Sequence, residues 1–139
     1  KNIVPLALQL AAMQRDCIEL QNQAQTKDGT VERSFLHVLD VCDAVLAGLK
    51  WLETQVGCLE AFNIAHSTTI SIQGLLDEVA KVTQSEIRVQ PAVYQHEELA
   101  QLGANIDKAE KVLAWTPKRS LTQMIEDEWR FYLNTLKGN

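Results

Sequence analysis

The feature that most constrains the fold of this chain is the segment at residues 33–40 (RSFLHVLD), together with the apolar repeat that follows it. If the segment is extended, Leu36 and Val38 point to one side and His37 to the other, because side chains alternate along a strand. Asp40 is a good N-cap residue, since its carboxylate can accept hydrogen bonds from the free N–H groups of a first helical turn. The segment therefore predicts an extended run, with an arginine at its start, that leads into a capped helix.

The helix predicted after Asp40 is amphipathic and should run to about Gln55. Gly57 would end it, because glycine readily adopts the left-handed conformation that is common just past a helix. The apolar residues recur at spacings of three and four, which places them on one face toward a core. This predicted inward face consists of Val41, Ala44, Val45, Gly48, Leu49 and Leu52.

The rest of the chain alternates between helices and short strands. Ser71, Asp107 and Ser120 are predicted N-caps, because their side-chain oxygens can accept hydrogen bonds from first-turn N–H groups. Apolar periodicity predicts further helices at residues 3–16, 72–83, 107–114 and from 121 onward, and strands at 17–21, 60–65 and 87–91. Helices dominate, so the fold class is α/β, helix-rich with a few short strands, in one domain.

Composition and charge exclude several classes of function. The 139 residues are 46% hydrophobic and 22% charged, an ordinary globular composition. The net charge is −5 with scattered Lys and Arg residues, so nucleic acid is not expected as a partner. No apolar run approaches the roughly 20 residues of a membrane span, and no signal peptide is visible, so we expect no membrane and a cytoplasmic location. Cys17, Cys42 and Cys58 read as free thiols, and no residue group has metal-ligand spacing.

Five short motifs follow one another along the chain. They are N-I-V-P at residues 2–5, T-K-D-G-T at 26–30 followed by the segment at 33–40, F-N-I at 62–64, Ser71 with its helix, and D-K-A through W-T-P at 107–117. In the same order they resemble the C-terminal half of the extended short-chain dehydrogenase/reductases, the NAD-dependent nucleotide-sugar epimerases and dehydratases. The second motif is most similar to the UDP-sugar 4-epimerases, the UDP-glucose 4-epimerase type. Each motif is weak by itself, and their order carries the resemblance.

The resemblance implies that residues 1–139 form a nucleotide-sugar (substrate) binding domain. In this family that domain closes over a substrate bound at a Rossmann domain, which this chain lacks. The sequence has no glycine-rich phosphate loop after a strand, and neither Tyr94 nor Tyr132 has a lysine four residues later. NAD would therefore be bound by a missing N-terminal domain, and the chain alone is predicted inactive. The chain starts at Lys1 without a methionine, and we expect it to be a fragment of a larger protein.

The same resemblance implies a set of substrate contacts. Asn2, Ile3 and Arg33 would contact the diphosphate of the nucleotide-sugar, and the strand at 19–21 would lie beside the nucleobase. A guanidinium suits this role, because its planar fork of donors matches phosphate oxygens. The family's Arg-x-Gly-Asp is replaced here by residues 95–98 (QHEE), and its glycine-rich loop after the F-N-I strand by residues 65–69 (AHSTT). The implied substrate-binding residues are Asn2, Ile3, Glu19, Leu20, Gln21, Arg33, Gln95 and Glu98.

These observations lead to one main function and two alternatives. The main hypothesis is the substrate-binding portion of an NAD-dependent nucleotide-sugar epimerase, an isomerase whose partners are the nucleotide-sugar and its own Rossmann domain. A dehydratase or reductase of the same superfamily is the nearest alternative. A non-catalytic interaction module derived from the fold is the other, suggested by the altered segments. The sequence leaves open the sugar, the base and the oligomeric state, with a homodimer among the states of the parent. His37 is read as structural, bonding a backbone group beside the helix start.

Overall fold

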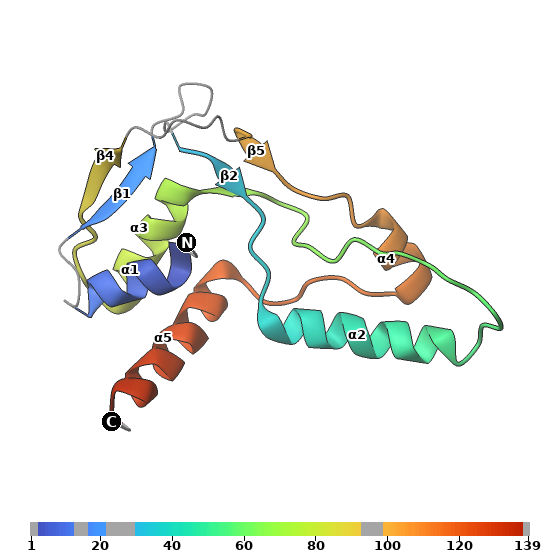
Figure 1. Cartoon of the computed structure of the whole chain (residues 1–139). Coiled ribbons are helices and arrows are strands. Elements are labelled where there is room, and N and C mark those ends of the chain that lie inside the picture. The colour runs from blue at the N-terminus through green and yellow to red at the C-terminus, as the bar shows by residue number, and fades with distance from the viewer. Residues whose placement is uncertain (1–2, 13–16, 22–29, 93–98, 138–139) are drawn as a thin grey trace.

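The computed structural model describes residues 3–12, 17–21, 30–92 and 99–137, and within them five helices and five strands (Figure 1). The helices are α1 (Ile3–Ala11), α2 (Val38–Leu52), α3 (Ile72–Thr83), α4 (Asp107–Leu113) and α5 (Leu121–Lys137). The strands are β1 (Ile18–Gln21), β2 (Glu32–Arg33), β3 (Ile70–Ser71), β4 (Val89–Ala92) and β5 (Gln101–Leu102). The helix-rich α/β class predicted from the sequence is confirmed. None of the described helices is long and apolar enough to cross a membrane.

The strands form two small sheets. β1 and β4 pair in parallel over four residues each, which confirms the two strands predicted near residues 17–21 and 87–91. The second sheet has the order β3-β2-β5, with β2 antiparallel to β3 and parallel to β5. β2 is therefore the central strand of this sheet, and its last residue is Arg33.

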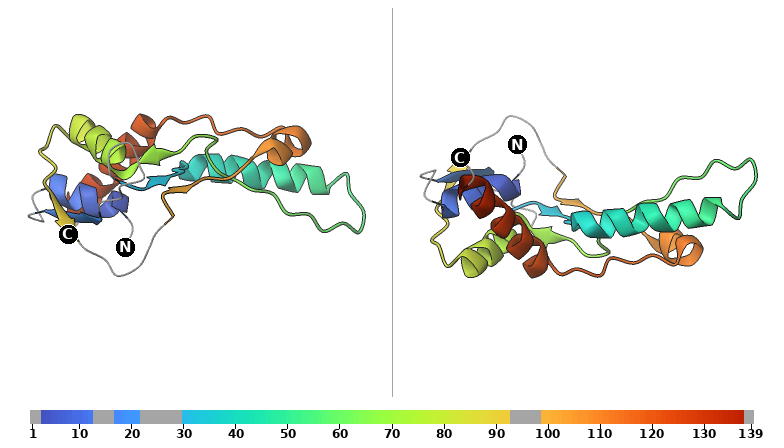
Figure 2. Two further views of the ribbon diagram at one scale, coloured as in Figure 1. Left: turned by 90° about the horizontal axis from the view of Figure 1, so that it is seen from above. Right: turned by 90° about the horizontal axis from the view of Figure 1, so that it is seen from below.

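Two hydrophobic clusters give the molecule two lobes. The first cluster lies among α1, α3 and α5, beside the β1–β4 sheet, and we call this part the three-helix lobe. The second lies between α2 and α4, and we call that part the α2–α4 lobe. Figure 2 shows α2 and α4 extending away from the other helices, so the molecule is elongated. Two separate cores mean that the contacts between them set the angle between the lobes.

The three-helix lobe follows the predictions at α3 and α5, whereas α1 ends at Ala11 although a helix was predicted over residues 3–16, of which 13–16 lie outside the described residues. Ser71 caps α3, because its Oγ accepts a hydrogen bond from the Gly74 N–H at 3.0 Å. Ser120 likewise accepts from the Gln123 N–H at the start of α5. The residues predicted to face inward on α3 are buried, and with residues from α1 and α5 they exclude water from the core. The most deeply buried of these side chains are Leu8, Leu75, Leu76, Val79 and Ile125.

The start of α2 differs from the prediction. The N-cap is His37, with extended backbone and with its Nδ1 accepting the Leu39 N–H at 3.0 Å. Asp40 lies inside the first turn and is fully buried, so the prediction that Asp40 caps the helix was wrong. The helix begins three residues earlier than predicted, so its first free N–H groups lie beside His37, and the Asp40 carboxylate is left for a tertiary partner. The structural reading of His37 is confirmed.

The buried face of α2 also differs from the prediction. Ala44 is buried, but the remaining large residues of the predicted inward face point to solvent. Their exposed fractions are Val41 40%, Val45 58%, Leu49 55% and Leu52 49%. The helix instead rests on the side that carries Asp40, Ala44 and Ala47. Apolar residues thus extend farther around α2 than its contact with α4 reaches, and within the described chain only one edge of that apolar face is buried.

The segment at residues 57–65 was predicted to contain a buried strand at 60–65, and the structure shows none there. Among the described residues, no strand pairs with this segment, and a strand needs a neighbour to satisfy its backbone groups.

Two helix boundaries also differ from the prediction. α2 ends at Leu52, three residues short of the prediction, and Gly57 has a positive φ of 63° in the following loop. At α4 the N-cap position is Ile106, and Asp107 is the first helical residue rather than the cap.

Candidate functional site

The most informative side chain of the β3-β2-β5 sheet is Arg33, at the end of the central strand. Its Nη1 donates to the backbone oxygen of Glu32 at 2.8 Å and to that of Leu99 at 2.9 Å. The side chain is half-buried, and it holds the chain that leads into β5 against β2. These bonds fix the position of the guanidinium at the end of β2, beside the chain that leads into β5.

The neighbouring residue, Glu32, organises a different set of contacts. Its Oε2 accepts from the Thr69 hydroxyl at 2.7 Å and from Gln101 Nε2 at 3.0 Å, so this carboxylate of β2 bonds to β5 and to the residue just before β3. Successive side chains of a strand point to opposite faces, so this cluster and Arg33 belong to opposite faces of the sheet. A shallow hollow of about 570 Å³ lies next to it, lined by Ser67, Thr68, Thr69, Gln101, Gly103, Ala104 and Asn105.

The other predicted substrate-binding residues are placed only in part. Ile3 is the first residue of α1 and packs against the core of the three-helix lobe. Glu19 is exposed on β1, and the strand pairs Leu20 with Pro91 and Gln21 with Ala92. In Figure 1 the carboxyl end of β1 and the start of β2 lie on the same upper side of the molecule. Asn2, Gln95 and Glu98 lie outside the described residues, and the substrate role of the whole set stays a prediction.

The sequence did not reveal a buried charge cluster between the lobes. Asp40 accepts two bonds from Arg119, one from its backbone N–H at 3.1 Å and one from its Nη1 at 2.5 Å. The same Nη1 donates to Asp43 at 3.0 Å. Trp115 donates its Nε1–H to the backbone oxygen of Asp40, also at 3.0 Å. The only feature of the sequence that pointed to this cluster was the Asp40 carboxylate among the apolar residues of a helix. Its partner, Arg119, lies 79 positions further along the chain.

A second polar contact joins α2 to α5. Nε2 of His37 lies 3.3 Å from the Asp127 carboxylate. Because Nδ1 of the same ring accepts the N–H of Leu39, the ring proton of the neutral imidazole is placed on Nε2, where it can donate to Asp127. The His37 side chain is 4% exposed. Together with the Asp40 cluster, this contact ties the first turn of α2 to the segment that opens α5.

The surroundings of Asp40 shift its pKa. Burial by itself raises the pKa of the carboxyl, but the backbone N–H groups of Arg119 and Lys118 and the guanidinium of Arg119 bond the charged form and lower it. The net result is a pKa below the usual value. The pKa of Arg119 is raised, chiefly by its hydrogen bond to Asp43, so the pair stays charged across the ordinary pH range.

This shift predicts an acid-sensitive step in stability. A carboxyl whose folded-state pKa is depressed stabilises the fold above its unfolded pKa of about 3.9, and that stabilisation is lost as the pH falls through the folded-state value. We expect the free energy of unfolding to drop as the pH falls below about 4, and the drop to be smaller in an Asp40→Asn variant. Urea unfolding at several pH values measures both. An identical acid response in the two proteins would show that Asp40 does not supply this dependence.

The segment at residues 57–65 is held extended by side chains rather than by a sheet. Lys108 contacts the Glu60 carboxylate, donates to the backbone oxygen of Ala61 at 2.8 Å, and lies 5.0 Å from the ring centre of Phe62. Phe62 in turn meets the Trp51 ring edge-on, with ring centres 5.5 Å apart. The pKa of Glu60 is lowered, first by its bond to Lys108. The segment is therefore fixed against α2 and α4 although no strand pairs with it.

The chain is similar to a group of nucleotide-sugar enzymes. A family model described as GDP-mannose 4,6-dehydratase matches residues 1–128. The UDP-glucose 4-epimerase of Rhizobium meliloti (strain 1021) is 30% identical over 136 residues, which are 97% of this chain and 41% of that protein. The UDP-glucose 4-epimerase of Lacticaseibacillus casei is 32% identical over 139 residues, 99% of this chain and 42% of that protein. The chain thus spans about two fifths of the length of these curated relatives.

Solved structures share the fold over the whole chain. A crystal structure of a UDP-glucose 4-epimerase is 31% identical, with a TM-score of 0.89, and the match covers 100% of this chain and 43% of that one. A UDP-glucose 4-epimerase from Stenotrophomonas maltophila, with bound NAD and formylated UDP-arabinopyranose, gives a TM-score of 0.94. That match covers 100% of this chain and 41% of that one, and at 23% identity it shows the fold alone.

Proposed function

Because this chain belongs to the extended short-chain dehydrogenase/reductase family that includes GDP-mannose 4,6-dehydratase and UDP-glucose 4-epimerase, we propose that it is the substrate-binding portion of a UDP-sugar epimerase. The observation that carries the proposal is the agreement of sequence and fold over the full chain with UDP-glucose 4-epimerases. The predicted contact residue Arg33 supports it, since this side chain is fixed at the end of the central strand β2. The reaction would invert one hydroxyl-bearing carbon of the sugar.

We propose that Arg33 binds the diphosphate of the nucleotide-sugar. Its charge and planar donor set suit phosphate oxygens, and its bonds to Glu32 and Leu99 hold the side chain in place before the ligand arrives. The backbone of β1 at residues 19–21 would lie beside the nucleobase. Asn2 and Ile3 would contact the diphosphate, and Gln95 and Glu98 would complete the set of substrate-binding residues. The chain would thus supply affinity and orientation rather than the reacting groups.

NAD would supply the hydride chemistry of such an epimerase, and the residues of this chain do not fit it. The sequence has no glycine-rich loop between a strand and a helix that could cradle a pyrophosphate, and neither tyrosine is followed by a lysine four residues later. No residue here is therefore assigned to NAD. We propose that a second, NAD-binding half of the same protein holds the cofactor and the proton-transferring pair.

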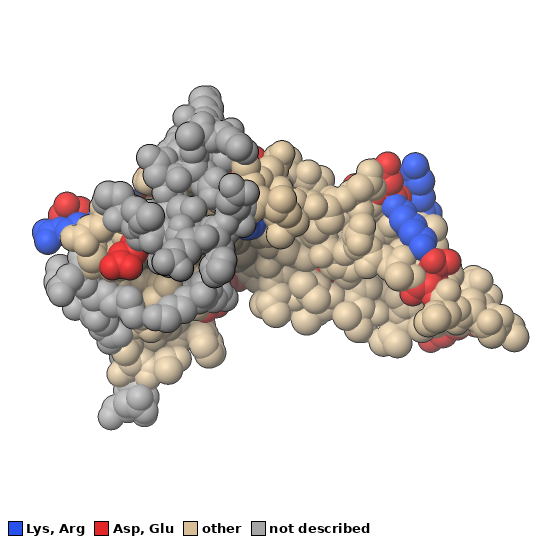
Figure 3. Space-filling view, turned by 45° about the horizontal axis from the view of Figure 1, so that its top comes forward, with Lys and Arg blue, Asp and Glu red and all other residues tan. Residues whose placement is uncertain are grey.

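The exposed side of α2 is the proposed contact with that second half. Val41, Val45, Leu49 and Leu52 form an apolar stripe along α2, and 40–58% of each side chain is exposed. In Figure 3 the visible face of the α2–α4 lobe carries few charged atoms, and these gather toward its far end. An exposed apolar stripe such as that of α2 marks an interaction site. The chain matches about 41% of the length of its relative from Rhizobium meliloti. The remaining length of such a protein is enough for a domain that covers the stripe.

The proposal predicts a large and selective effect of Arg33. In the full-length protein, Arg33→Ala should raise KM for UDP-glucose by roughly 10- to 100-fold, because a charge-assisted hydrogen bond to phosphate is worth about 1.5–3 kcal/mol. Arg33→Lys keeps the charge but not the fork, and should give a smaller rise. Steady-state kinetics with UDP-glucose and UDP-N-acetylglucosamine measure both.

Arg88→Ala is the matched control for this experiment. Arg88 precedes β4, is 69% exposed, and makes a loose contact of 3.6 Å with Glu86. Its removal should leave KM unchanged. Unfolding curves of all variants would separate a lost ligand contact from a disturbed β2–β5 edge. An unchanged KM in a folded Arg33→Ala enzyme would contradict the assignment.

The same assay also distinguishes the two alternative functions, a dehydratase and a non-catalytic interaction module. Conversion of UDP-glucose to a 4-keto-6-deoxy product rather than to a 4-epimer would indicate a dehydratase of the same superfamily. A full-length protein that binds no nucleotide-sugar would favour a non-catalytic interaction module. The altered segments at residues 65–69 and 95–98, which replace the glycine-rich loop and the Arg-x-Gly-Asp of the family, are the observation that keeps this second candidate open.

A further inference from the structure

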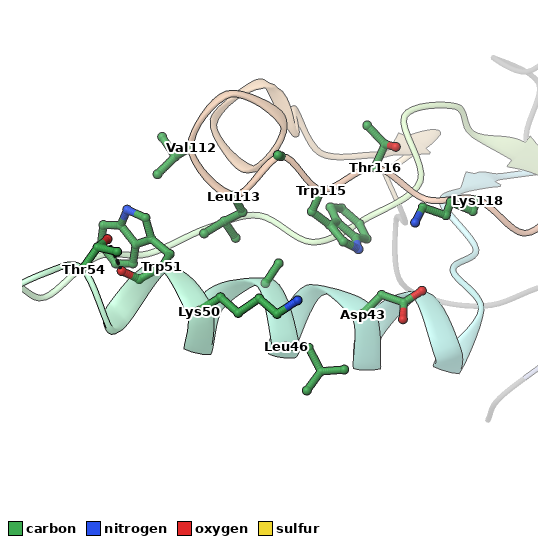
Figure 4. Close-up of a pocket in the computed structure, with 12 residues that line it drawn as sticks. Asp43, Leu46, Lys50, Trp51, Thr54, Val112, Leu113, Trp115, Thr116 and Lys118 are labelled. Carbon is green, nitrogen blue, oxygen red and sulfur yellow. Dashed lines mark hydrogen bonds between the residues drawn. The ribbon is translucent and has the colours of Figure 1, made fainter.

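A pocket of about 490 Å³ lies between α2 and α4, within the size range of small-molecule sites (Figure 4). Two indole rings, Trp51 and Trp115, and several aliphatic side chains form its walls. The residues that line it come from two stretches of the chain far apart in sequence. They are Asp43, Leu46, Ala47, Lys50, Trp51 and Thr54 from α2 and its end, and Val112, Leu113, Ala114, Trp115, Thr116 and Lys118 from α4 and beyond.

The pocket lies on a different side of α2 from the apolar stripe. At about 100° per residue, the pocket positions 43, 46, 47, 50 and 54 are centred about 160° away from the stripe positions 41, 45, 49 and 52. These are nearly opposite faces of the helix. A contact confined to the stripe would therefore not cover the α2 residues that line the pocket. The pocket is thus a site separate from the proposed substrate contacts and from the proposed domain contact.

The aromatic walls of the pocket are fixed in advance. The ring of Trp115 is 3% exposed overall and is held by the bond from its Nε1 to the Asp40 backbone oxygen. The other indole, Trp51, packs edge-on against Phe62. Trp115 is therefore a fixed part of the pocket wall, and Trp51 is the indole with accessible surface. A flat ligand that contacts Trp51 would meet a ring already held in place, which lowers the cost of binding.

The charges around the pocket favour an anion with one charge. Figure 4 shows the Lys50 and Lys118 side chains directed toward the Trp115 ring from either side. Among the described residues, neither ammonium group makes an ion pair. The carboxylate at the rim, Asp43, is already bonded to Arg119, which Asp40 shares. The charged groups in and beside the pocket thus leave one net positive charge, although the whole chain carries −5. They are the cations Lys50, Lys118 and Arg119 and the carboxylates Asp40 and Asp43.

We propose that this pocket binds a planar aromatic carboxylate. The ring would lie against the indole of Trp51 and the aliphatic wall, and the carboxylate would lie between the ammonium groups of Lys50 and Lys118. A doubly charged phosphate is a poorer match, because the neighbouring Asp43 carboxylate leaves only one net positive charge to meet it. This site does not depend on the proposed epimerase function.

The test uses the chain as described here and 2-naphthoate as the probe. We expect saturable binding with a dissociation constant below about 1 mM, followed by tryptophan fluorescence and by the indole N–H signals in NMR. The signals of Trp51 and Trp115 should shift, and that of Trp129, which lies on α5, should not. The Lys50→Gln, Lys118→Gln double variant should bind about tenfold more weakly. Uncharged 2-naphthylmethanol should bind as weakly to the unaltered chain as 2-naphthoate does to that variant.

Lys81→Gln is the control, because Lys81 is an exposed lysine on α3, far along the chain from the pocket residues. It should bind 2-naphthoate like the unaltered chain. The lysines of the pocket are exposed, so their replacement leaves the fold intact. Equal binding of the acid and the alcohol, equal binding by the double variant, or shifts spread over all three tryptophans would each overturn the proposal. If the same substitutions changed the epimerase activity of the full-length protein, that result would bear on the proposed function and not on this site.

Discussion

Replacing Asp40 by alanine is expected to lower the free energy of unfolding by about 2–4 kcal/mol, because the change leaves a guanidinium and buried backbone N–H groups without their acceptor. The carboxylate is fully buried and accepts two bonds from Arg119, which lies at the entrance to α5. Its backbone oxygen also holds Trp115. One side chain therefore joins α2 to the segment between α4 and α5, and its loss should loosen both. Urea unfolding at neutral pH, followed by tryptophan fluorescence, measures the change.

Asp43→Ala is the matched control for this prediction. Asp43 lies on the same helix, carries the same charge and bonds the same Nη1 of Arg119, but its side chain is 38% exposed. An exposed ion pair typically contributes less than about 1 kcal/mol, so this variant should be only slightly destabilised. Equal losses in the two variants would show that burial of Asp40 is not what makes its contact strong. A further comparison, Asp40→Asn, keeps the shape and removes only the charge.

The double substitution Val45→Glu, Leu49→Glu in the apolar stripe of α2 is expected to reduce kcat/KM of the full-length protein by at least about 100-fold. Both side chains are more than half exposed in this chain, so the chain itself should fold as before. In the assembled protein, however, the carboxylates would be buried without partners, at a cost of several kcal/mol. The two halves should then separate or lose their alignment. Steady-state kinetics and the retention of NAD during gel filtration measure the effect.

Leu46→Glu tests whether the effect belongs to the stripe. Leu46 is on the same helix and is similarly exposed at 57%, but it lies on the pocket side. This variant should keep most of its activity. If Leu46→Glu and the double variant lose activity to the same extent, then the stripe is not the contact with the NAD-binding half. If neither loses activity, then a different surface of the chain makes that contact.

The two predictions concern separate properties of α2. The Asp40 contact holds α2 to its own lobe and to the start of α5, so it acts within the described chain. The stripe faces outward and matters only with a partner present. Unfolding of the isolated chain should therefore respond to Asp40 and not to the stripe, and activity of the full-length protein should respond to both.

The sequence by itself determined the local structure of this protein. Ser71 and Ser120 were found as caps, and the inward residues of α3 were read correctly, because a cap and a helical period are properties of neighbouring residues. The strands β1 and β4 followed from alternation for the same reason. The order of five short motifs also identified the family, which the family model and the fold confirmed.

Only the tertiary structure decided how α2 is used. Periodicity showed that the helix is apolar over a wide arc, but not which part of the arc this chain covers, since that depends on where Trp115 and α4 lie. It also could not show that His37 would cap the helix and leave Asp40 for Arg119, because the two residues of that pair are 79 positions apart. The predicted strand at 60–65 failed for a related reason. A strand forms only where a neighbour pairs with it, and a sequence pattern records the tendency of a segment but not the presence of its partner.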